Sequence, residues 1–90
     1  MKYTYPAIFS EREESGLRVV TVTFPDLDIE LTGFGYSDCY NYASRVLAEK
    51  LIEMEENNIP FPKPSDPMYL DVEPEDATLF ISVNLKKYKK

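Results

Sequence analysis

The chain has 90 residues and a mass of 10.4 kDa, which fits one small domain. Hydrophobic residues make up 43% of it, enough to build a core and too many for an intrinsically disordered chain. Ten Lys and Arg against sixteen Asp and Glu leave a net charge of −6, which argues against nucleic-acid binding through a basic patch. The absence of histidine excludes imidazole bases, His-ligated metals, and Ser-His or Cys-His nucleophiles.

The cysteine count and the hydropathy pattern indicate the compartment. A single cysteine cannot close an internal disulfide, which suits a reducing environment. No apolar run approaches the length of a membrane span, and no signal-peptide pattern is present. We therefore expect a cytoplasmic protein that contacts no membrane. Because so small a domain is marginally stable without disulfides or metals, we also expect self-association or a partner to stabilise it.

The first half of the chain predicts a β-meander of three strands, over residues 3–9, 17–24 and 29–34. Pro6 has no N–H, so its nitrogen is expected to point away from a neighbouring strand. Residues 11–16 predict a polar hairpin loop in which Gly16 has a positive φ. Pro25 and Asp26 predict the turn that precedes the third strand.

A helix is predicted to begin at Ser37, whose hydroxyl can cap it, and to end at Asn57. Its apolar residues recur at helical spacing and form one stripe: Tyr40, Ala43, Leu47, Leu51 and Met54. The prolines in residues 60–67 then predict a stiff, extended crossover, with a polyproline ligand as the alternative. Strict alternation over residues 78–85 predicts a fourth strand.

The predicted order is βββαβ, an α+β fold in which one helix packs on a four-stranded sheet and residues 1–90 form a single domain. One helix covers only one face of a sheet. The other face is expected to present Ile8, Val19, Thr21 and Phe80. We interpret these residues as a self-association surface, with cover by another part of the chain as the alternative.

Five short motifs follow one another between residues 3 and 88. They are Tyr5-Pro6-Ala7-Ile8-Phe9, Val20-Thr21-Val22-Thr23-Phe24-Pro25-Asp26-Leu27, Gly35 and Ser37 before a helix with Ala43 and Leu47, Pro60-Phe61-Pro62-Lys63-Pro64-Ser65, and Val83-Asn84-Leu85 with Tyr88. In this order they resemble the HicB-type antitoxin family. The chain departs from that family where Asp28-Ile29-Glu30 replaces the usual Pro-Gly-Cys, which makes the turn more acidic.

The resemblance implies a truncated RNase H-like domain that binds a HicA-type toxin, a small basic ribonuclease, and blocks its active site and RNA surface. It also implies a homo-oligomer, because members commonly self-associate. Many members carry a C-terminal DNA-binding module, which would begin near Lys90, so direct DNA binding by this chain is not expected. The alternative is a stand-alone structural or regulatory module that forms homo-oligomers without a cognate toxin.

The residues argue against an enzyme. RNase H-like nucleases hold two metals with clustered carboxylates, one of them on the first strand, and residues 3–9 carry none. Asp26, Asp28 and Glu30 are interpreted as solvated turn charges, with a reduced metal-dependent nuclease site as a distant alternative. Cys39 has no histidine to activate it and is expected to be a small buried hydrophobe. We expect no metal and no cofactor.

Glutamates at helical spacing mark the candidate partner-binding surface, which comprises Glu49, Glu53 and Glu56 with Tyr42 near the same ridge. Carboxylates there would occupy the places of RNA phosphates on a basic toxin, and the aromatic ring would anchor the contact. A solvated helix face is the alternative. The lysines within residues 86–90 are predicted to form a frayed, solubilising end.

Overall fold

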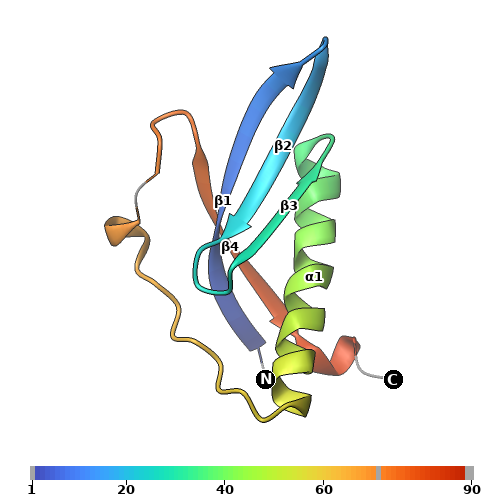
Figure 1. The fold of residues 1–90 in the computed structure, drawn as a ribbon, viewed down its shortest axis with the longest axis vertical. Helices are drawn as coiled ribbons and strands as arrows, with labels where there is room; N and C mark the ends of the chain where they lie inside the picture. The colour runs from blue at the N-terminus through green and yellow to red at the C-terminus, as the bar shows by residue number, and fades with distance from the viewer. Residues whose placement is uncertain (1, 71, 89–90) are drawn as a thin grey trace.

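The computed structural model describes residues 2–70 and 72–88, in which four antiparallel strands form one sheet and one α-helix packs on it (Figure 1). The elements are β1 (Lys2–Glu14), β2 (Leu17–Phe24), β3 (Ile29–Gly33), α1 (Tyr36–Glu56), the 3₁₀ turn η1 (Pro67–Tyr69), β4 (Ala77–Asn84) and the 3₁₀ turn η2 (Leu85–Lys87). The strand order is β3-β2-β1-β4. The predicted βββαβ order and the α+β class are confirmed.

The β1–β2 hairpin is longer than predicted. Pairing continues to Glu14 opposite Leu17, so most of the predicted loop is strand. Only Ser15 and Gly16 make the turn, with φ of 51° and 82°, the positive pair that a type I′ hairpin turn requires. The charged residues remain in strand because they pair across it, as Arg18 does with Glu11 at 2.6 Å. Figure 1 shows this hairpin extending beyond the rest of the sheet.

The core lies between α1 and the face of the sheet that carries every second residue of each strand. Phe9, Val20, Val22, Phe24 and Ile81 contribute from the strands and are fully buried. The helix contributes Cys39, Ala43, Leu47, Ala48, Leu51 and Met54. Tyr40, which was predicted to belong to this stripe, is 39% exposed, although its ring stacks on the buried Phe9 with the ring centroids 6.5 Å apart.

The two ends of α1 are held by backbone geometry. The prediction that Ser37 caps the helix is wrong, since the helix begins earlier and the N-cap is Gly35, at φ 85°, without a side-chain cap. At the other end Asn58 adopts φ 57°. The amide of Ile59 donates to the carbonyl of Met54 at 2.8 Å, and the amide of Asn58 donates to the carbonyl of Glu55 at 3.2 Å. These bonds form a Schellman motif, which ends the helix at the predicted place.

The proline-rich segment after α1 is a strap fastened to the sheet. The Phe61 ring meets the Tyr3 ring edge to face at 5.0 Å, and the Tyr5 hydroxyl donates to the Pro62 carbonyl at 2.6 Å. Both Asp26 carboxylate oxygens accept hydrogen bonds from Ser65, one from its amide at 3.0 Å and one from its hydroxyl. The segment is therefore the predicted crossover, and its side chains and backbone are bound to the sheet of the same chain.

The Tyr5 hydroxyl makes the stability of this strap depend on pH. Burial raises the pKa of Tyr5, and the nearby Asp26 and Tyr3 raise it further. Because the folded-state pKa lies above the unfolded value of about 10, the stabilisation is complete below about pH 10 and is lost as pH rises from there through the folded-state pKa. We expect the free energy of unfolding of the wild type to fall more between neutral and alkaline pH than that of Tyr5→Phe.

Urea unfolding at each pH measures this difference. Tyr5→Phe is expected to cost about 1 kcal/mol at neutral pH, where the hydrogen bond is intact, and less at alkaline pH. The matched control is Tyr42→Phe, which removes an exposed hydroxyl and should follow the wild-type pH profile. Identical alkaline losses for the wild type and Tyr5→Phe would contradict a role for the buried phenol.

Candidate partner-binding surface

The predicted partner-binding residues lie along one exposed side of α1. Tyr42, Glu49, Glu53 and Glu56 are all exposed, and their spacing of seven, four and three residues keeps them on the side opposite the core. At 1.5 Å per residue the row is about 21 Å long. The helix therefore presents it as one continuous surface.

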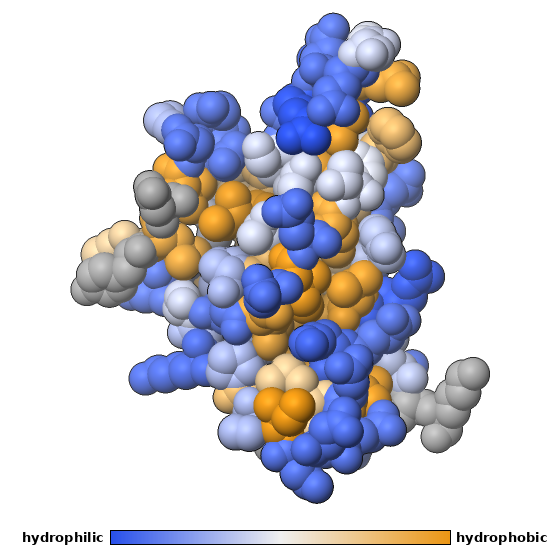
Figure 2. Space-filling view, in the orientation of Figure 1, coloured by the Kyte–Doolittle hydropathy of each residue, from blue (hydrophilic) through white to orange (hydrophobic). Residues whose placement is uncertain are grey.

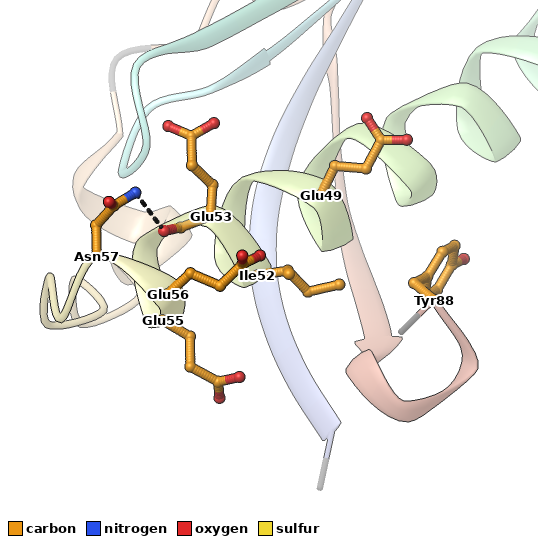
Figure 3. Close-up of a pocket in the computed structure, with 7 residues that line it drawn as sticks. All are labelled: Glu49, Ile52, Glu53, Glu55, Glu56, Asn57 and Tyr88. Atoms are coloured by element: carbon orange, nitrogen blue, oxygen red, sulfur yellow. Dashed lines mark hydrogen bonds between the residues drawn. The ribbon is translucent and has the colours of Figure 1, made fainter. Parts of the chain in front are cut away.

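The C-terminal half of this row borders an open hollow, shown in Figure 3. Its lining consists of Glu49, Ile52, Glu53, Glu55, Glu56, Asn57 and Tyr88. We call this the acidic hollow. The structure thus brings three of the predicted residues together and adds Tyr88, which reaches the helix from the turn after β4. Figure 3 shows its ring across from Glu49 and Ile52, while Glu53 and Glu55 point in opposite directions.

The charges of the acidic hollow do not favour the helix that carries them. The last turn of α1 contains no basic residue, although the C-terminal end of a helix dipole is negative and favours cations. Glu49 and Glu53 also repel each other at i,i+4 spacing, by a few tenths of a kcal/mol. Lys50 approaches Glu53 only to 3.8 Å. Added positive charge would therefore be favourable here, and a basic partner is one source of it.

Tyr42 lies apart from the acidic hollow and has a different neighbour. The Arg45 guanidinium carbon is 5.3 Å from the centroid of the Tyr42 ring, a cation–π arrangement. Asp38, Asn41, Tyr42 and Arg45 line a second, smaller depression. The row on α1 is thus acidic at its C-terminal end and carries an aromatic ring beside a cation at its N-terminal end.

The predicted self-association residues differ in how much surface they offer. Phe80 is 56% exposed, Ile8 and Thr21 are half-buried, and Val19 is only 6% exposed. Figure 2 shows hydrophobic residues gathered in the middle of the view that it shares with Figure 1. Among the four residues, Phe80 is the one most available to a second molecule.

The remaining candidates for chemistry, Asp26 in the acidic turn and the cysteine, are bound or buried within the fold. Asp26 is engaged by Ser65, and the described part of the chain contains no group of three His, Cys, Asp or Glu placed to hold a metal ion. Cys39 is buried as predicted, with its Sγ 3.8 Å from the Val20 carbonyl. Burial raises the pKa of the Cys39 thiol, and Asp38 adds to this. The thiol is thereby kept in its unreactive, protonated form.

The end of the described chain contains an ordered turn. The Lys86 amide donates to the Asn84 side chain at 3.1 Å, and the Tyr88 amide donates to the Leu85 carbonyl at 3.0 Å. Lys89 and Lys90, which belong to the predicted frayed end, lie outside the described residues. No helix in the described ranges is long and apolar enough to cross a membrane.

Comparison with known proteins gives a match at the level of structure. No family model and no curated protein matches the chain. The structure is similar to a chain from a toxin–antitoxin complex of Streptococcus pneumoniae, with a TM-score of 0.83 and 24% sequence identity. The match covers 98% of this chain and 73% of that chain. The two chains therefore share one fold, and that fold occurs in a component of a toxin–antitoxin complex.

Proposed function

We propose that this protein is an antitoxin-like binding protein that neutralises a basic ribonuclease toxin of the HicA type. The observation that carries the proposal is the acidic hollow, where four glutamates gather at the negative end of α1 on a fold shared with a component of a toxin–antitoxin complex. An RNA-binding surface is basic because it contacts phosphates. An array of carboxylates on a rigid helix suits the same surface.

In this proposal the protein acts by occupying a surface and carries out no reaction. The negative charge of the chain and of the acidic hollow accelerates the encounter with a basic toxin, and salt weakens this attraction. Glu49, Glu53 and Glu56 take the places of RNA phosphates, while Tyr42 anchors the other end of the row. A toxin held over about 21 Å of helix cannot admit RNA to the covered surface.

Reversing the three central charges tests this surface. The variant Glu49→Lys, Glu53→Lys and Glu56→Lys is expected to slow association with the toxin by about tenfold or more at low salt, because the charges that steer the encounter are inverted. Stopped-flow or surface-binding kinetics at two salt concentrations measure the effect. The wild-type rate should fall steeply with salt, and the rate of the variant should not.

A matched control separates local from overall charge. The variant Glu13→Lys, Glu73→Lys and Glu75→Lys makes the same change in net charge at exposed positions outside the acidic hollow. It should retain most of the wild-type rate. Full binding by the first variant would exclude the acidic hollow. The partner for these experiments is the product of the adjacent reading frame, which we expect to be a short, basic, histidine-containing protein.

One observation favours a second function. The exposed Phe80 on an open sheet is an unusual feature of a protein that functions as a monomer, and it suits a stand-alone module that forms homo-oligomers without a toxin. A defined oligomer together with an adjacent reading frame that encodes no basic protein would favour this alternative.

A further inference from the structure

The outer edge of β4 lacks the features that normally protect an edge strand. The sheet order places β3 and β4 at its two edges. Natural edge strands are short, carry charges or proline, or contain a bulge. The strand β3 has five residues and contains Glu30, whereas β4 has eight residues with neither a charge nor a proline. Its register against β1 runs without a break, so no bulge interrupts it.

The pairing of β4 with β1 shows which backbone groups face outward. Pro6 lies directly opposite Phe80 and has no N–H, so the two residues cannot exchange the paired bonds of a hydrogen-bonded site. In an antiparallel ladder the N–H and C=O of Phe80 must then point to the free edge. Alternation gives the same direction to these groups of Thr78 and Ser82. Within the described residues, no backbone hydrogen bond from a loop or turn is made to Thr78, Phe80 or Ser82.

Apolar side chains flank this edge on both faces of the sheet. Phe80 is 56% exposed on the face away from α1, and Leu79 is 37% exposed on the opposite face. An uncharged edge with unpaired backbone groups and apolar side chains on both faces is the arrangement that pairs with another strand.

The charge of the chain favours a second copy as the partner. Two molecules of net charge −6 repel each other overall, so a contact between copies is least opposed at a surface without charged side chains. Among the described strands and α1, β4 is the one element without a charged side chain. A basic toxin, in contrast, gains no charge complementarity from this edge. The toxin proposal and the β4 edge therefore concern different partners.

We propose that two copies of this chain pair their β4 strands antiparallel about a twofold axis and form one eight-stranded sheet. With the axis at Phe80, each Phe80 lies opposite the other, and each Thr78 lies opposite Ser82 of the second copy. The outward groups of these residues then form about six backbone hydrogen bonds. The two Phe80 rings meet as a cross-strand aromatic pair on the face away from the helices.

Sedimentation equilibrium of the full chain over a wide concentration range tests the proposal. The wild type is expected to dimerise, and Phe80→Lys should raise the dimer Kd by about tenfold or more, because it places two cations together at the axis. The matched control Phe34→Lys makes the same substitution at a residue that is 63% exposed and away from β4, and its Kd should stay near that of the wild type. A wild type that stays monomeric, or a dimer that both variants leave intact, would overturn the proposal.

A second variant distinguishes edge pairing from packing of the open sheet faces. Thr78→Pro removes an outward N–H and spares the bonds between β1 and β4, so it should weaken an edge-paired dimer by about tenfold while leaving a face-packed dimer intact. Circular dichroism checks that this variant folds.

Hydrogen exchange of the wild type decides the question if Thr78→Pro does not fold. The amides of Thr78, Phe80 and Ser82 should exchange fast at low concentration and slowly once the dimer forms. Fast exchange in the dimer would exclude the β4 edge. Measuring toxin binding by Phe80→Lys tests the two proposals separately. This variant leaves the acidic hollow unchanged, so it should bind the toxin like the wild type even though its dimer is weakened.

Discussion

Phe9→Ala is expected to lower the free energy of unfolding by about 3–5 kcal/mol, a large share of the stability of a domain this size. Phe9 is fully buried on β1, between its strand neighbours Val22 and Ala77. Its ring also stacks on Tyr36, with the ring centroids 5.7 Å apart and the planes at 11°. Alanine would leave a cavity under the first turns of α1, where rigid strand backbones limit collapse.

Urea unfolding of the purified variants measures this loss. Phe34→Ala is the matched control, since it removes the same ring from an exposed position and should change stability by no more than about 0.5 kcal/mol. A double-mutant cycle with Tyr36→Ala should show that the two rings are coupled, because each loses its partner in the single variants. A loss for Phe9→Ala as small as that of Phe34→Ala would contradict this account of the core.

Gly33→Ala is expected to lower the free energy of unfolding by about 1–3 kcal/mol, because the added methyl group would collide with a residue of α1. A Cβ at residue 33 would stand 2.8 Å from Sγ of Cys39, closer than van der Waals contact permits. Gly33 is held opposite Val20 in the sheet, and Cys39 is buried in the first turn of α1. Neither element can move away without loss of other contacts, so the helix and strand would have to separate slightly.

Removal of the sulfur should relieve this clash. Cys39→Ala alone leaves a small void, and the double variant Gly33→Ala with Cys39→Ala should be less destabilised than the sum of the two single variants. Gly35→Ala is the contrasting control: its Cβ would meet nothing within 4 Å, and its cost comes from φ 85°. Cys39→Ala should not reduce that cost. Additivity for Gly33→Ala with Cys39→Ala would show that the sulfur does not set the close approach.

The two proposed interfaces use separate parts of the molecule. The acidic hollow is formed by α1 and Tyr88, whereas the proposed dimer uses the free edge of β4. One surface is charged and suits a basic partner, and the other is uncharged and suits a copy that bears the same net charge. A dimer of this kind would carry two acidic hollows.

Local patterns of alternating and β-branched residues, bounded by turn residues, were sufficient to predict all four strands. The helical stripe was sufficient to predict α1, because its spacing follows from the repeat of a helix. The row of Tyr42 and the three glutamates could be predicted for the same reason. The hairpin loop was predicted too long, since charged residues were assigned to a loop before their partners across the strand were known. Ser37 was assigned as a cap from its hydroxyl, although Gly35 supplies the backbone geometry that begins the helix.

Contacts between residues distant in the chain could not be inferred from local patterns. Tyr88 reaches the acidic hollow because β4 returns along β1 and ends beside α1, and Tyr5 meets Pro62 because the crossover passes the start of β1. The free edge of β4 depends on strand order, and its outward groups depend on the register that sets Pro6 opposite Phe80. Periodicity specifies which side of an element is apolar, whereas packing and pairing specify what that side meets. The secondary-structure elements of this protein could therefore be predicted from its sequence, whereas its two proposed surfaces form only when those elements pack together.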